Sequence, residues 1–222
     1  ITINNGDIRV TSSDDGINVA NGVDGSGGRP GRETTTYSGG NYLYLNGGHI
    51  VVNAGGDGVD VNGAAEMTGG TLIVNGPIEM MNGALDYDAY FKISGGVVLA
   101  SGSSGMAQAP GTGSTQASLL IYFTASQPAG TLVHIRTSGG EPVLTIAPGK
   151  DFQSLAVSSP KLVQGASYEI LLGGSASGDA VDGLYGDATT VTGGAAYQSF
   201  TINGVATTVG SGGNQRMRGP RP

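Results

Sequence analysis

The stretch Met67-x-x-Gly70-x-Leu72-x-Val74 decides the fold, because its pattern of one glycine between regularly spaced apolar residues recurs along the chain. Further copies begin at Ile3, Leu45 and Ile93, so the successive intervals are 42, 22 and 26 residues. Repeats of about this length with alternating apolar positions are typical of β-coils that bury a core only by stacking on their neighbours. The sequence therefore predicts an all-β protein that begins with a parallel β-helix.

The repeat also predicts how the chain is divided. Residues 1–110 carry the coils, and the excess length of the first interval falls in a Gly-, Ser- and Thr-rich segment at 21–41, which predicts a long loop. Short strands separated by turns over 117–209 predict a small antiparallel β module, either a sandwich or a cap on the last coil. Residues 210–222 have the composition of a flexible basic Gly/Pro tail.

Composition narrows the possible partners. The 222 residues include 42 Gly and no Cys, which excludes disulfides and thiolate metal sites. The net charge is −7, with 7 − 17 = −10 over residues 1–213 and +3 in the tail. A body this acidic disfavours nucleic acid and anionic membranes as partners and favours cations. No stretch is long and apolar enough for membrane insertion, and the start at Ile1, within a strand, predicts a processed or excised form.

A second pattern stacks acidic residues. Asp15-Gly16-Ile17-Asn18, Asp57-Gly58-Val59-Asp60 and Gly83-Ala84-Leu85-Asp86 occupy equivalent places in successive coils. Parallel strands lie ~4.8 Å apart, so carboxylates in register repel one another unless they are protonated or bridged by a cation. Several hard oxygen ligands without His or Cys favour Ca²⁺. The candidate ligands are Asp15, Asp57, Asp60 and Asp86, with Asp14, Asn18 and Asp88 as secondary ones; the alternative is that the Asp-Gly pairs only form turns.

Exposed aromatic residues give a candidate carbohydrate surface. In Tyr42-Leu43-Tyr44-Leu45 the leucines share the inward parity of the repeat, so both tyrosine rings are expected to point outward. Flat rings suit the apolar faces of sugars, and their hydroxyls suit the rims. Tyr87 and Tyr90 flank the acidic residues and are candidates for the same groove. The alternative is an ordinary exposed strand.

Catalytic groups are scarce. A β-elimination lyase needs a base such as a desolvated Lys or Arg, but Lys92 and Arg9 have no neighbour in the sequence that would lower a pKa. Glycoside hydrolysis needs two free carboxylates, whereas the stacked aspartates are assigned to metal. His49 and His134 are the only histidines and form no recognisable triad. The sequence favours a protein that is not an enzyme.

Several long motifs carry a family resemblance. They are Gly56-Asp57-Gly58-Val59-Asp60-Val61-Asn62-Gly63, Met67 to Pro77, Gly83-Ala84-Leu85-Asp86-Tyr87-Asp88, and Ala100 to Gln108. This region closely resembles a bacterial family of secreted carbohydrate-binding proteins, which are right-handed parallel β-helices related in form to calcium-dependent pectate lyases. The resemblance covers about 1–110 strongly and the rest more loosely. It implies a non-catalytic protein, secreted or at the cell surface, that binds cellulose-like or pectic polysaccharides and holds calcium through its aspartates, with earlier coils missing from this chain.

A structural role is the main alternative function. A β-helix end can accept another subunit, and head-to-tail contacts that do not close give a filament. The +3 tail could dock on the −10 body of a neighbouring copy. The alternative is therefore a subunit of an extracellular fibre, a homo-oligomer built by stacking. A pectate-lyase-like enzyme is a third, less favoured function.

Overall fold

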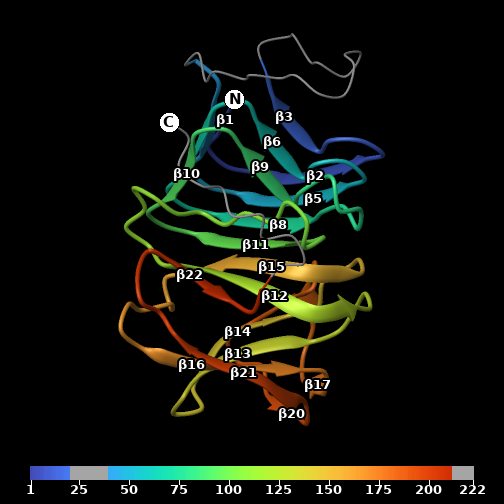
Figure 1. Ribbon diagram of the computed structural model, residues 1–222, viewed down its shortest axis with the longest axis vertical. Helices are drawn as coiled ribbons and strands as arrows, with labels where there is room; N and C mark the ends of the chain where they lie inside the picture. Colours follow the sequence, from blue (N-terminus) through green and yellow to red (C-terminus); the bar gives the residue numbers. More distant parts are fainter. Residues whose placement is uncertain (21–39, 212–222) are drawn as a thin grey trace.

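The computed structural model describes residues 1–20 and 40–211, and within those ranges the secondary structure consists only of strands. The all-β class is therefore confirmed. Most of the loop predicted at 21–41 and nearly all of the tail predicted at 210–222 lie outside the described residues. Figure 1 shows stacked strands from the N-terminal half above a second group of strands from the C-terminal half.

Three parallel sheets form the N-terminal half. Each of the first three repeats contributes one strand to every sheet, and the fourth repeat contributes a strand to the first two sheets. The first sheet contains β1 (Thr2–Ile3), β4 (Tyr42–Leu45), β7 (Ala64–Met67) and β10 (Tyr90–Ile93). The second begins with β2 (Asp7–Ser12), β5 (His49–Ala54), β8 (Thr71–Asn75) and β11 (Val97–Gly102). The third contains β3 (Ile17–Val19), β6 (Val59–Val61) and β9 (Leu85–Tyr87).

Strand register follows the sequence repeat. Ile3 pairs with Leu45, Leu45 with Met67, and Met67 with Ile93, so the first apolar residues of all four copies stack. The glycine of each copy turns the chain from the first sheet into the second with a positive φ, for example 84° at Gly70. An L side chain rarely adopts that conformation, which explains why the repeat requires glycine there.

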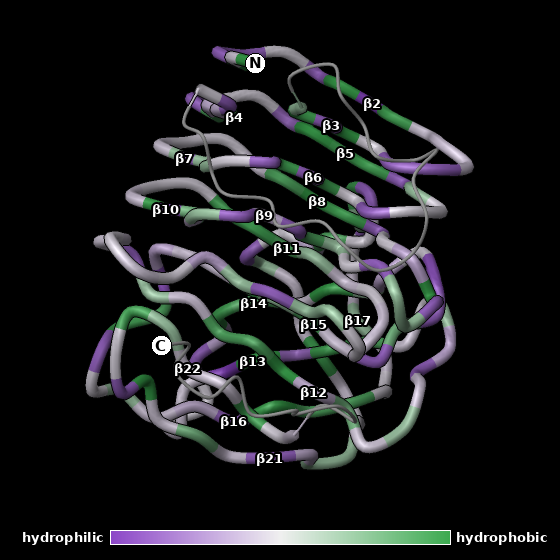
Figure 2. The backbone as a smooth tube through the Cα atoms, turned by 45° about the horizontal axis from the view of Figure 1, so that its top comes forward, coloured by the Kyte–Doolittle hydropathy of each residue, from purple (hydrophilic) through white to green (hydrophobic). Residues whose placement is uncertain are grey.

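Alternate residues of the parallel strands fill one apolar core. Leu45, Met67 and Ile93 are buried beneath the first sheet, and Leu72 and Val74 are buried beneath the second. Figure 2 shows the apolar segments of β5, β8 and β11 lying above one another. Stacking buries these side chains because a single coil has no opposing layer of its own.

The C-terminal strands extend the second sheet and cover part of its outer face. The strands involved are β12 (Ser118–Gln127), β13 (Val133–Thr137), β14 (Pro142–Ile146), β15 (Phe152–Ser158), β16 (Ser167–Leu172), β17 (Ser175–Ala176), β18 (Ala180–Val181), β19 (Leu184–Tyr185), β20 (Val191–Thr192), β21 (Ala195–Thr201) and β22 (Ala206–Val209). β15 pairs antiparallel with β11, and the sheet continues through β12 to β22. Ile73 and Leu99, on the outer face of β8 and β11, belong to a second core with residues of the six-stranded sheet β18-β19-β14-β13-β16-β21.

Candidate functional site

The acidic residues of the third sheet stack in register, as the repeat predicts. Asn18 on β3 pairs with Asp60 on β6, and Asp60 pairs with Asp86 on β9. Asn18 Nδ2 donates to Asp60 Oδ2 and to Asp15 Oδ2, both at 3.0 Å. Asp57 lies just before β6, as Asp15 lies just before β3. We call these five residues the acidic column: Asp15, Asn18, Asp57, Asp60 and Asp86.

Backbone and amide donors satisfy much of the acidic column. Asp57 N donates to Asp15 Oδ1 at 2.8 Å, and Gly83 N donates to Asp57 Oδ1 at 2.6 Å. Asn62 Nδ2 donates to Asp60 Oδ1 at 3.3 Å, and Gln108 Nε2 donates to Asp86 Oδ1 at 3.4 Å. Each carboxylate therefore links one coil to its neighbour or to a nearby loop, so the column contributes to the stacking of the coils.

The column nevertheless holds charge that water solvates incompletely. Partial burial, together with repulsion from Asp15 and Asp86, raises the pKa of Asp60 to about 7. Burial raises the pKa of Asp57 to about 6 against the opposing effect of the Gly83 hydrogen bond. A proton or a cation between the coils would relieve this repulsion.

The donor geometry offers no converged metal site in the described ranges. Among residues 1–20 and 40–211, no three His, Asp or Glu side chains are grouped so that they could hold one ion. The Asn18 amide occupies the space between Asp15 and Asp60, where a bridging cation would sit. Of the secondary candidates, Asp14 N donates to Ser12 Oγ, and Asp88 N donates to Val61 O at the end of β9.

Deprotonation of the acidic column is expected to lower the free energy of unfolding as pH rises from about 5 to about 8. Asp60 and Asp57 have folded-state pKa values above the usual 3.8, so the folded protein binds more protons than the unfolded chain in this window. Because Asp60 is only half-buried, we discount its shift for solvent screening and expect a contribution of about 1 to 2 kcal/mol. The measurement is urea unfolding at pH 5, 6.5 and 8 in a chelator.

Asp60→Asn separates this effect from other titrating groups. The pKa of buried His134 is lowered by desolvation, so protonation of His134 opposes folding as pH falls, with the opposite sign. The wild type and Asp60→Asn both keep His134, so its contribution cancels when their free energies of unfolding are compared at each pH. The variant should gain about 1 to 2 kcal/mol over the wild type between pH 5 and pH 8. Parallel pH profiles for the two proteins would contradict the assignment to Asp60.

Three of the four predicted tyrosines converge on the outer face of the first sheet. The rings of Tyr42 and Tyr44 on β4 stack with centroids 5.7 Å apart and planes 11° apart. Tyr42 pairs with Ala64 on β7, and Ala64 pairs with Tyr90 on β10, so a small side chain separates the tyrosines of two strands. All three tyrosines are half-buried, which leaves part of each ring accessible.

Charged residues border these rings. Glu66 pairs with Tyr44 on one side and with Lys92 on the other. Tyr90 donates through its hydroxyl to Glu66 Oε1 at 3.2 Å, and Lys92 Nζ lies 3.7 Å from the same oxygen and 4.0 Å from the Tyr90 ring centroid. Desolvation and the Glu66 charge raise the pKa of Tyr44. We call this group, Tyr42, Tyr44, Tyr90, Glu66 and Lys92, the tyrosine face.

Tyr87 does not join the tyrosine face. It lies on β9 beside Asp86, packs edge-on against Phe91 with centroids 6.1 Å apart, and donates through its hydroxyl to Ala109 O at 2.8 Å. Burial raises its pKa to about 12. Tyr87 is therefore a packing residue between the third sheet and the 105–110 segment, and its ring is turned away from the surface that the other three share.

The residues considered as catalytic bases all have partners. Arg9 forms ion pairs with Asp7 and Asp182, and Lys92 with Glu66. His134 Nδ1 lies 2.8 Å from Thr145 Oγ1.

Sequence reasoning missed Glu66 and the bordering role of Lys92, although the repeat contained the signal. The intervals of 22 and 26 residues that relate the repeats carry Tyr44 to Glu66 and Glu66 to Lys92. Projecting each outward position along these intervals would have assembled the tyrosine face. The repeat also gave no sign of the contact that His49 makes, in which its Nε2 lies 2.7 Å from Asp182 Oδ2.

Comparisons with known proteins give no relative from which a site could be transferred. No family model matches the chain, and no curated protein or solved structure matches it either. Within residues 1–20 and 40–211, there is no helix of the length and hydropathy needed to cross a membrane.

Proposed function

We propose that this protein is a secreted or cell-surface, non-catalytic carbohydrate-binding protein that takes an extended glycan along its tyrosine face. The observation that carries the proposal is the arrangement of Tyr42, Tyr44 and Tyr90 around the small Ala64 on one exposed sheet. Rings arranged in this way offer successive apolar contacts to a chain of sugar units.

The polar residues of the tyrosine face support the same ligand class. Glu66 accepts hydrogen bonds and Lys92 donates them, and both lie beside the rings. Sugars present a ring of hydroxyls around an apolar face, so a site for them needs aromatic and hydrogen-bonding groups together. Lys92 also suits the carboxylates of a pectic chain, whereas a cellulose-like chain would use mainly the rings and Glu66.

The proposed architecture is a right-handed parallel β-helix of the carbohydrate-binding family that the sequence resembles. Its support is the stacking of successive repeats in three parallel sheets, with a positive-φ glycine between the first-sheet and second-sheet strands of each repeat. Such a scaffold holds outward side chains at fixed spacing over several coils. It would therefore present rigid, regularly spaced contacts to a polymeric ligand.

Calcium binding at the acidic column is part of the proposal, with a condition. The charge and raised pKa values of Asp57 and Asp60 favour a cation, but the Asn18 amide would have to turn away to admit one. Calcium added at pH 8 should then raise the melting temperature of the wild type more than that of Asp60→Asn. Equal shifts in both proteins would remove the column from the calcium proposal and leave the tyrosine face unaffected.

Glycan binding should weaken about tenfold when either Tyr44 or Tyr90 is replaced by Ala, a loss of ~1.4 kcal/mol. The physical reason is the loss of one ring contact with the apolar face of a sugar unit. The measurement is affinity electrophoresis in polygalacturonate and sedimentation with insoluble cellulose, each repeated in a chelator. No unsaturated product should accumulate.

A matched control is Tyr185→Ala, which removes a half-buried tyrosine that lies on β19, outside the tyrosine face. This variant should bind the glycan as the wild type does. Equal losses in all three variants, or binding that survives a Tyr44/Tyr90 double replacement, would contradict the proposed surface.

A further inference from the structure

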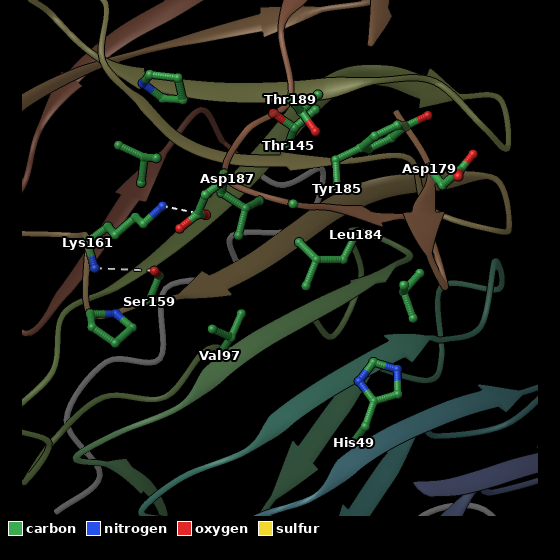
Figure 3. A pocket seen from close by; sticks show the side chains of 16 residues that line it. His49, Val97, Thr145, Ser159, Lys161, Asp179, Leu184, Tyr185, Asp187 and Thr189 are labelled. Carbon is green, nitrogen blue, oxygen red and sulfur yellow. Dashed lines mark hydrogen bonds and ion pairs between the residues drawn. The ribbon is translucent and has the colours of Figure 1, made fainter. Parts of the chain in front are cut away.

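A cavity of about 740 Å³ lies away from the tyrosine face, where the C-terminal strands meet the second sheet. Its walls come from β5, β11 and β14, from the turn at 159–161, and from the β18–β19 hairpin with the loop that follows it. This volume is in the range of sites for small organic molecules. Figure 3 shows the lining side chains gathered around the space, with His49 from the parallel half and Tyr185 from the hairpin.

The hairpin wall is tied to the parallel half by ionic contacts. Asp182, at the hairpin turn, accepts a hydrogen bond from Arg9 on β2 at 2.5 Å, and its other oxygen lies 2.7 Å from His49 Nε2. Gly183 O also accepts a hydrogen bond from Ala147 N at 2.8 Å. These contacts hold both sides of the cavity in place, so the space is largely formed before a ligand enters.

Most of the lining is apolar, with Val97, Leu144, Pro160, Val181 and Leu184 among its residues. Several of its polar atoms are already used within the protein. Lys161 Nζ pairs with Asp187 at 2.6 Å, Thr145 Oγ1 contacts His134, and Ser159 Oγ accepts from Lys161 N at 3.2 Å. A sugar needs many unused hydrogen-bonding groups, so this cavity suits a mainly apolar molecule.

One carboxylate of the lining is exposed and lies where a ligand could reach it. Lys161 and Asp187 neutralise each other, whereas Asp179 has no ion-pair partner among the residues that the structure describes. Asp179 and Tyr185 both line the cavity, and Figure 3 shows them in neighbouring parts of the wall that the β18–β19 hairpin forms. A carboxylate beside an aromatic ring is the combination that attracts an organic cation.

We propose that this cavity binds a small organic cation with an apolar body, such as a primary or quaternary ammonium compound that carries an aliphatic or aromatic group. The apolar body packs against Val97, Leu144 and Leu184, and the ammonium group lies beside Asp179 and the Tyr185 ring. This site is independent of the proposed glycan surface, because the two share no residue.

The test is a titration of the full chain with three probes that share one apolar body: 4-phenylbutylammonium, 4-phenylbutanol and 4-phenylbutanoate. Binding is followed by amide chemical shifts and calorimetry at low ionic strength. The ammonium compound should bind at least tenfold more tightly than the carboxylate, with the alcohol between them. Shifts should centre on β14 and the β18–β19 hairpin.

Two exposed or half-buried positions test the cation site without disturbing a core. Asp179→Asn should reduce the preference for the ammonium compound over the alcohol to less than twofold. Tyr185→Leu keeps the apolar contact and should weaken only ammonium binding, by two- to fivefold. Glu79→Gln, which changes an exposed acid outside the lining, is the control and should change nothing. Equal affinities for the three probes, tighter binding of the carboxylate, or no saturable binding would overturn the proposal.

Discussion

Gly58→Ala is expected to lower the free energy of unfolding by about 3 kcal/mol, or the melting temperature by roughly 6 to 12 °C. A β-carbon at this position would lie 2.3 Å from Val74 Cγ1 and 2.4 Å from Ala84 O. The second contact is with backbone, and Val59, the next residue, pairs with Leu85 in the neighbouring coil. The strain therefore disturbs the stacking of two coils and cannot be relieved by moving one side chain.

The repeat itself suggests a compensating variant. Position 58 faces Val74, whereas the equivalent position in the next coil is Ala84, and the residue in register with Val74 is Ala100. The pair Gly58 and Val74 thus corresponds to the pair Ala84 and Ala100 in the next coil, so a larger residue at one of the two positions accompanies a smaller residue at the other. Gly58→Ala combined with Val74→Ala should recover part of the loss, but not all of it, because the contact with Ala84 O remains.

The measurement is the free energy of unfolding in urea of both variants, with Gly204→Ala as the control. Nothing lies within 4 Å of a β-carbon at Gly204, and its φ is not in the left-handed region, so that replacement should be within ~0.5 kcal/mol of the wild type. A Gly58→Ala protein as stable as Gly204→Ala would show that the coils shift apart easily, contrary to the tight stacking described.

The repeat made the stacked half predictable. The apolar positions, the turn glycines and the Asn18–Asp60–Asp86 register all follow from one period, because parallel strands of successive coils must pair residue by residue. The same period carries Tyr44 to Glu66 and Lys92, and so contains most of the tyrosine face. Handedness came from the family resemblance, and calcium from the stacked carboxylates together with that resemblance; both stay proposals.

The remaining contacts do not recur along the chain, so the repeat could not predict them. Asp182 meets His49 across 133 residues, and nothing in either sequence neighbourhood indicates the other. Tyr87 is the last residue of the short strand β9, and its hydroxyl donates to the carbonyl of Ala109, which only the folded path of the chain brings near. Cavities between the two halves depend on many such contacts, so the cavity between β14 and the β18–β19 hairpin could not be predicted from the sequence.

Lys150→Met should destabilise the protein by about 2 to 4 kcal/mol, because it removes the side chain that ties the C-terminal strands to two coils. Lys150 Nζ donates to Ala54 O at 2.5 Å and to Gly76 O at 3.2 Å, at the ends of β5 and β8. Met keeps most of the aliphatic stem but leaves both carbonyls without that donor. Desolvation lowers the pKa of Lys150, in keeping with a cation that protein carbonyls solvate in place of water.

Lys161→Met is the matched control, since it removes a lysine from the same C-terminal half whose partner is far more exposed. The Lys161 and Asp187 side chains are 41% and 83% exposed, and such pairs contribute up to about 1 kcal/mol. Urea unfolding compares the two variants, and hydrogen exchange locates the weakening. Exchange should quicken around β5 and β8 in Lys150→Met alone. Similar losses in both variants would mean that Lys150 acts as an ordinary surface charge and that the β11–β15 pairing, the shared apolar core and the Asp182 contacts join the two halves without it.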